Sequence, residues 1–316
     1  KGDLVAGFRT VHVAILSLLF LPLSLSPRSV RQLVGPDRSG LGQAMADEEE
    51  GNHVLDLCGG QLPDLEKVTI GDDVQEIDLT ENRLKEVDGR ILNLRGLKRI
   101  SFRKNLLTDV EALDEMSSAG GLLELVLYDN HIKKLPPLGN FKMISKFDSS
   151  YNKVRSMEPV RALSSSVEEL YLASNKIVEI EPMAHLTNLK VLELGYNRIR
   201  KMDAVAECWS GLRELWLGKN KIQEIRGLGS LTGLTKLSIQ NNRITKMEGL
   251  ETLVNLEELY LSFNGLTKIE GLENLKGLKV LDLASNQIER IEGLGTLAAL
   301  EDLWLDNNAI EVVENI

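Results

Sequence analysis

Hydrophobic residues recur through most of this chain in a pattern that repeats about every 22 residues. The clearest unit, "LEELYLSFNGLTKIEGLENLKG" (residues 256–277), has leucine at its first, fourth and sixth positions and asparagine at its ninth. Positions four and six alternate with position five, and this period of two predicts a short β-strand with one buried and one open face. The aliphatic residues after the asparagine are expected to reach the same core from the opposite side, with "EGL" turning the chain.

The asparagine recurs in register eleven times, at spacings of 22 to 25 residues. It stands at Asn82, Asn105, Asn130, Asn152, Asn175, Asn197, Asn220, Asn242, Asn264, Asn286 and Asn308. A degenerate copy, "VLDLCGG", precedes the first. Self-similarity of this length is the signature of leucine-rich repeats. We therefore expect an α/β solenoid with a curved parallel β-sheet on its concave face and short helical or irregular segments on its convex face. The asparagine amides should bond backbone groups of adjoining coils.

The repeats predict one domain over residues 51–316, of about twelve coils, after an N-terminal extension over residues 1–50. The apolar stretch 11–26, "VHVAILSLLFLPLSLS", has the form of a signal-peptide core preceded by basic residues. The competing interpretation, which we favour because the rest of the chain looks intracellular, is that translation begins at Met45. Residues 1–44 would then be a gene-model artefact. We also expect a C-terminal cap beyond Ile316, because the sequence ends inside a repeat.

Charge and composition narrow the possible functions. The chain has 47 acidic and 37 basic side chains and a net charge of -10, which argues against nucleic acid as a partner. It has two cysteines without a CxxC motif, and its four histidines are far apart in the repeat frame. We therefore predict no disulfide framework and no metal site. We also expect no cofactor and no enzymatic activity. The protein is expected to be a monomer in the cytoplasm or nucleus. No membrane association is expected unless residues 11–26 are a genuine signal.

The residues at position five form the open face of the predicted sheet. In chain order they are Asp78, Ser101, Val126, Asp148, Tyr171, Glu193, Trp216, Ser238, Tyr260, Asp282 and Trp304. From Tyr171 onward an aromatic residue occupies every second repeat, and an acid stands two positions before each of them. Duplication of a two-repeat unit would explain the alternation, but it would not remove the cost of leaving apolar area in water.

Aromatic residues among charges on a rigid sheet are typical of a protein-binding surface. We therefore predict a partner-binding site on the concave face. Its residues are Asp148, Tyr171, Glu193, Trp216, Tyr260, Asp282, Asp302 and Trp304.

The repeats resemble those of the leucine-rich-repeat regulatory subunits of protein phosphatase 1. The segments "LELGYNRIR", "LWLGKNKI", "LSIQNNRITKMEGL", "LVNLEELYLSFNGL" and "LKVLDLASNQI" are similar to consecutive repeats of that family. The similarity is strongest over residues 143–316 and continues in register from Val74. It implies a non-catalytic protein that docks the phosphatase catalytic subunit on its concave face. The implied contacts are Asp148, Tyr171, Glu193, Trp216, Asp282, Asp302 and Trp304.

The chain departs from that family in several ways. Tyr171 and Trp216 stand where the family usually has phenylalanine, and a further concave tyrosine and a capping motif would lie beyond Ile316. The family's acidic N-terminal tail is longer, and an apolar leader is foreign to it. Two alternatives therefore stay open: another intracellular adaptor of this repeat type, axonemal or cytoskeletal, or a secreted recognition module that uses residues 11–26 as a signal. An enzyme would require sequence beyond Ile316.

Overall fold

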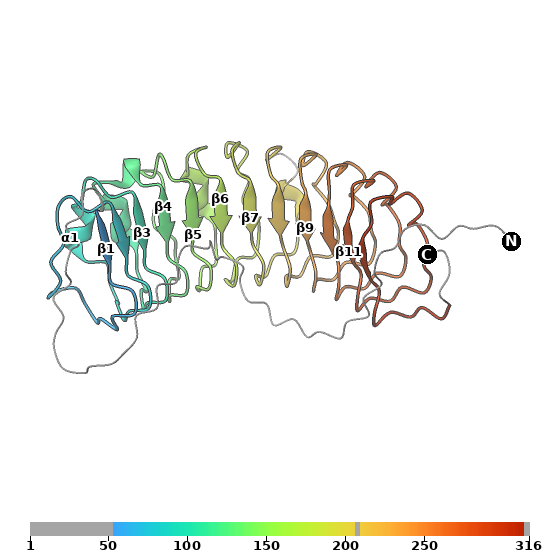
Figure 1. Cartoon of the computed structure of the whole chain (residues 1–316), viewed down its shortest axis with the longest axis horizontal. Coiled ribbons are helices and arrows are strands. Elements are labelled where there is room, and N and C mark those ends of the chain that lie inside the picture. The colour runs from blue at the N-terminus through green and yellow to red at the C-terminus, as the bar shows by residue number, and fades with distance from the viewer. Residues whose placement is uncertain (1–52, 206–208, 313–316) are drawn as a thin grey trace.

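The computed structural model describes residues 53–205 and 209–312, in which twelve parallel strands form one sheet (Figure 1). Strand order follows chain order, and each strand has three residues. The strands are β1 (Val54–Asp56), β2 (Glu76–Asp78), β3 (Arg99–Ser101), β4 (Glu124–Val126), β5 (Lys146–Asp148), β6 (Glu169–Tyr171), β7 (Val191–Glu193), β8 (Glu214–Trp216), β9 (Lys236–Ser238), β10 (Glu258–Tyr260), β11 (Val280–Asp282) and β12 (Asp302–Trp304). The predicted extension over residues 1–50, with its apolar stretch, lies outside the described residues.

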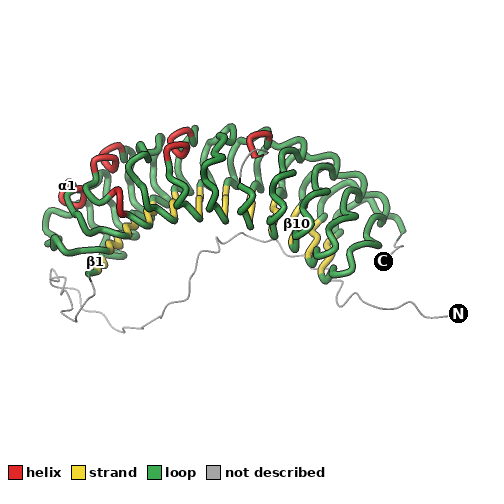
Figure 2. Tube along the Cα trace, turned by 90° about the horizontal axis from the view of Figure 1, so that it is seen from above, coloured by secondary structure: helices red, strands yellow, loops and turns green. Residues whose placement is uncertain are grey.

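The coils form an arch whose inner side carries the strands, and the helices lie on the outer side (Figure 2). The helices are short: α1 (Gly89–Leu92), η1 (Glu111–Glu115), η2 (Ala119–Gly121), η3 (Glu158–Ala162) and η4 (Asp203–Val205). None of the helices in the described part of the chain has the length and apolar character needed to cross a bilayer. The architecture confirms the predicted solenoid with a concave parallel sheet.

The core runs along the whole array because no single coil can enclose its own apolar side chains. The middle residue of each strand points inward, and Leu170, Leu215 and Leu259 have no exposed surface. Convex-side residues such as Ile269 and Leu272 are also buried and complete the same cluster. The predicted alternation of buried and open positions is confirmed in strands such as β6, β8 and β10, whereas position five is also buried in β5, β9 and β11.

The repeated asparagines form a ladder between coils, as the sequence predicts. The Asn220 side chain accepts a hydrogen bond from the Ile199 backbone N–H at 2.9 Å. Its amide donates to the Leu194 carbonyl of the preceding coil and to the Leu217 carbonyl of its own coil, each at 3.0 Å. All eleven asparagines make this set of bonds. The ladder therefore holds the strand-exit turns in one register along the sheet.

The glycine of the "EGL" turn is required by backbone geometry. Gly271 has a φ of +74°, and a β-carbon added there would lie 2.7 Å from the Met247 carbonyl oxygen. An L side chain in the left-handed region costs about 1–2 kcal/mol before any clash. We expect Gly271→Ala to lower the free energy of unfolding by about 2 kcal/mol, measured by urea denaturation. Gly229→Ala is the control, since a β-carbon at Gly229 meets open space; equal losses in the two variants would contradict the prediction.

Candidate functional site

Strand register places the position-five residues in one row across the concave sheet. Asp148 pairs with Tyr171, Tyr171 with Glu193, and Glu193 with Trp216. The row continues through Ser238, Tyr260, Asp282 and Trp304. Seven of the eight predicted site residues therefore lie in this row. Asp302 lies in the row beside it, formed by position three of each strand.

The aromatic side chains are half-buried and turn back toward their own strands. The Tyr171 hydroxyl donates to the Glu169 carboxylate at 3.0 Å, and the Trp216 indole Nε1–H donates to Glu214 at 3.0 Å. Tyr260 repeats the contact with its own position-three acid, Glu258, at 2.7 Å. Each of these rings therefore has its polar atom paired and its orientation fixed.

Trp304 is the exception. Within the described residues its indole has no hydrogen bond to Asp302, the acid two residues before it. An aspartate side chain is one methylene shorter than a glutamate. The sequence predicts aromatic rings standing in water, whereas in the structure all four are only partly exposed.

Two of the predicted acids are more enclosed than the sequence suggests. Asp148 and Asp282 are 9% and 7% exposed, and burial raises the pKa of both carboxyls. Asp148 accepts a hydrogen bond from the Ser150 backbone N–H at 2.8 Å. Asp282 accepts from the Ser262 hydroxyl at 2.6 Å and from the Ala284 N–H at 3.1 Å. These two acids therefore stabilise the sheet as well as shaping its surface.

Glu193 differs from both. Its carboxylate is partly exposed and has no hydrogen-bond or ion-pair partner among the residues that the structure describes. Burial, with a smaller contribution from Asp148, raises its pKa from 4.5 to about 7. It lies in register between Tyr171 and Trp216. It is thus a desolvated carboxylate between two aromatic residues.

A second row on the concave face is formed by position three of the strands. The sequence indicates its acids, and the structure adds the residues that stand between them. Lys146 pairs with Glu124 at 3.1 Å, and Lys236 pairs with Glu258 at 2.9 Å. The Lys236 ammonium also lies 5.3 Å from the centre of the Trp216 ring. The repeat alignment already contained this signal, since the acids at position three alternate with other residues there.

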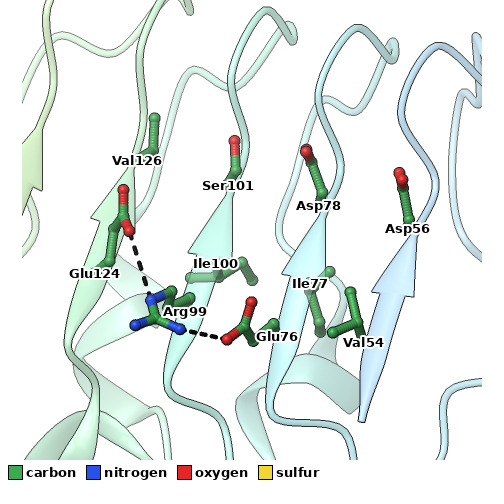
Figure 3. Close-up of a pocket in the computed structure, with 10 residues that line it drawn as sticks. All are labelled: Val54, Asp56, Glu76, Ile77, Asp78, Arg99, Ile100, Ser101, Glu124 and Val126. Carbon is green, nitrogen blue, oxygen red and sulfur yellow. Dashed lines mark hydrogen bonds and ion pairs between the residues drawn. The ribbon is translucent and has the colours of Figure 1, made fainter. Parts of the chain in front are cut away.

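The structure also shows a hollow that the sequence did not indicate, at the N-terminal end of the concave face (Figure 3). Its volume is about 270 Å³. Arg99 spans it, pairing with Glu76 on one side and with Glu124, at 3.8 Å, on the other. The lining residues are Val54, Asp56, Glu76, Ile77, Asp78, Arg99, Ile100, Ser101, Glu124 and Val126. The hollow exists because position five carries short side chains in β1–β4 and aromatic ones only from β6 onward.

The described residues include no group of three or more His, Cys, Asp or Glu side chains placed to hold a metal ion. The acids of the position-three row instead stand on every second strand from β2 to β12, about 10 Å from one to the next. That spacing suits contact with a large complementary surface.

Comparison with known proteins agrees with the repeat architecture. A family model described as leucine-rich repeats in two copies matches residues 165–207, 210–253, 254–296 and 276–315. An internalin (inlF) from Listeria monocytogenes is 26% identical, with a TM-score of 0.74 over 81% of this chain and 74% of that one. A leucine-rich-repeat protein of Leptospira interrogans is 28% identical, with a TM-score of 0.62 over 75% and 67%.

A curated relative adds a more specific similarity. The protein phosphatase 1 regulatory inhibitor subunit PPP1R7 homolog of Arabidopsis thaliana is 43% identical over 122 residues. The match covers 38% of this chain and 37% of that protein. The chain is therefore similar in fold to leucine-rich-repeat proteins and, over these 122 residues, similar in sequence to a regulatory inhibitor subunit of protein phosphatase 1.

Proposed function

We propose that this protein binds the catalytic subunit of protein phosphatase 1 on the concave face of β5–β12 and acts as a non-catalytic regulatory subunit. The name of the Arabidopsis relative supports the choice of partner. One observation carries the choice of surface. Four half-buried aromatic side chains occupy every second strand along a single row of the sheet, and two of the three residues between them are carboxylates.

The geometry suits tight protein binding for two reasons. Hydrogen bonds to Glu169, Glu214 and Glu258 already hold three of the rings in place, so ordering them on binding costs little entropy. Aromatic anchors at the centre of an interface carry a large share of its binding energy. The surrounding carboxylates favour a basic partner surface, which speeds association at low salt.

We expect Trp216→Ala to weaken binding of the phosphatase catalytic subunit by about 2 kcal/mol, or about 30-fold. Trp304→Ala should have an effect of the same order. Isothermal titration calorimetry with the purified catalytic subunit measures both. Val254→Ala is the control, because Val254 is 50% exposed but lies outside the strands, so its removal should leave affinity unchanged.

Thermal unfolding should show each variant fully folded at the temperature of the titration, since both indoles lie outside the leucine core. Wild-type affinity in both tryptophan variants would place the phosphatase elsewhere on the molecule. No binding by the wild type would overturn the partner itself and favour another adaptor function.

A further inference from the structure

From β2 to β12 the position-three row alternates acids with cations, except at two strands. Acids occupy this position in every even-numbered strand from β2 to β12. Between them stand Arg99 in β3, Lys146 in β5 and Lys236 in β9, each paired with a neighbouring acid. In β7 and β11 the same position holds Val191 and Val280. At these two strands the sheet's own pattern of charge compensation is broken.

The two valine strands coincide with the two places where a carboxylate stands between aromatic residues. We name the first the proximal box, formed by Tyr171, Val191, Glu193 and Trp216 on β6–β8. The second, the distal box, is formed by Tyr260, Val280, Asp282 and Trp304 on β10–β12. Each box therefore has an acid at its centre, an aromatic residue on either side and no cation of its own.

The charged groups around the proximal box confirm its imbalance. Glu169 and Glu214 border it, and each receives only one hydrogen bond, from an aromatic side chain. Lys146 pairs with Glu124. Lys236 lies over the Trp216 ring, but its ion pair is with Glu258 and not with an acid of the proximal box. The central carboxylate of Glu193 has no partner among the described residues, and Asp148, on β5, adds a further acid.

The distal box has the same arrangement of residues, but its central carboxylate accepts hydrogen bonds. Glu258 and Asp302 border it, and Lys236 pairs with Glu258 but not with Asp302. Asp282 accepts hydrogen bonds from Ser262 and Ala284. Among the described residues, no cation pairs with Asp282 or Asp302, and none lies over the rings of Tyr260 and Trp304.

One cation of the protein itself already contacts a residue of the proximal box. Lys236, between the two boxes, places its ammonium 5.3 Å from the Trp216 ring centre while pairing with Glu258 at 2.9 Å. Contact with an aromatic face and a carboxylate together is the environment that a lysine or arginine prefers once it is desolvated. Aromatic residues two strands apart are separated by about 10 Å, which leaves room for one cationic side chain between them.

We propose that each box receives one lysine or arginine side chain of the partner, which supplies the cation that Val191 and Val280 omit. The proposal rests on the proposed function, in that the partner is the phosphatase catalytic subunit. The boxes are four strands apart, so the two cationic side chains must lie about 19 Å apart on the partner surface.

A lysine introduced into a box by substitution of its valine tests the proposal. We expect Val191→Lys to weaken phosphatase binding at least 10-fold, because the new ammonium pairs with Glu169 and Glu214 as Lys236 pairs with Glu258. Val280→Lys should do the same at the distal box. Val191→Leu adds bulk without charge and should bind the phosphatase within about 3-fold of the wild type.

Val254→Lys makes the same charge change outside the sheet, and its affinity should also stay within about 3-fold of the wild type. Calorimetric titration gives the affinities, and thermal unfolding should show Val191→Lys at least as stable as the wild type.

A second titration removes the dependence on the phosphatase. Hexaarginine added at low salt should change the tryptophan fluorescence of the wild type and of Val254→Lys, and the Val191→Lys/Val280→Lys variant should lose most of this response. If the phosphatase does not bind but hexaarginine behaves in this way, the proposed partner fails and the boxes stand. Phosphatase binding that survives both lysine substitutions, an equal loss in Val191→Leu, or a hexaarginine response that the double variant keeps would overturn the proposal.

Discussion

Replacing Asn130 by alanine should lower the free energy of unfolding by on the order of 3 kcal/mol. Asn130 is 3% exposed, and its side chain joins two coils. Its oxygen accepts from the Leu107 N–H at 3.0 Å, and its amide donates to the Phe102 carbonyl at 2.8 Å and the Leu127 carbonyl at 3.1 Å. Both carbonyls keep a second asparagine donor, from Asn105 and Asn152. The Leu107 N–H has no second acceptor in the described structure, so it would be left buried and unpaired.

Urea denaturation followed by circular dichroism measures this loss. The matched control is Asn274→Ala, because Asn274 also donates to a backbone carbonyl of the preceding coil, that of Glu251 at 3.0 Å, but on the exposed surface. Water replaces that bond, and the expected loss is below about 1 kcal/mol. If both variants lose the same stability, the ladder has no special role in holding the coils together.

The second large effect is a pH dependence centred on Glu193. Its pKa is about 7 in the folded protein, against an ordinary value of 4.5. Below pH 4.5 the carboxyl is protonated in both states and contributes nothing to the difference. Between pH 4.5 and 7 the unfolded chain ionises first, so it binds fewer protons and the stability of the folded state falls as pH rises. Above pH 7 the carboxylate is ionised in both states, and its burial lowers the stability of the folded state by on the order of 3 kcal/mol.

Glutamine at this position cannot ionise, so Glu193→Gln should escape the penalty. We expect the variant to unfold like the wild type at pH 4 and to be more stable at pH 8, by up to about 3 kcal/mol. Denaturation curves at a series of pH values give the difference, in which the other titrating groups cancel. Glu292→Gln, at an exposed glutamate, should show no such divergence. A constant difference across the series would show that Glu193 titrates normally.

This penalty is a cost that the fold carries at neutral pH. The negative charge of Asp148 increases it. Val191, on the same strand, supplies no positive charge that would offset it. Such a cost is consistent with a surface whose charges are balanced by a partner, as in the proposed boxes.

The period of the sequence determined the architecture of this protein. Leucine at positions four and six makes one side of each strand apolar, and only stacking of coils can bury that side. The asparagine at position nine has the donor and acceptor needed to bond two backbones at once. The row of Tyr171, Trp216, Tyr260 and Trp304 followed from the same register, because parallel strands of equal repeats align equal positions.

Contacts between neighbouring strands could be settled only by the tertiary structure. Asp148 and Asp282 are hydrophilic and occupy a predicted open position, yet adjoining side chains bury them. The residues just before the asparagines adopt positive φ even where they are Tyr151, Tyr196 or Phe263, since the ladder imposes the turn on whatever residue stands there. The hollow along β1–β4 likewise depends on side-chain size across four strands.

The sequence by itself determined the solenoid, its concave sheet and the residues that line it, because these follow from a period repeated along one chain. The tertiary structure decided which of those side chains contact or bury one another and which stay unpaired. It turned three of the aromatic side chains onto their own acids, enclosed Asp148 and Asp282, and left Glu193 without a partner. The physical reason is that burial and pairing on a sheet depend on the lengths and directions of side chains from different coils, which no single repeat contains.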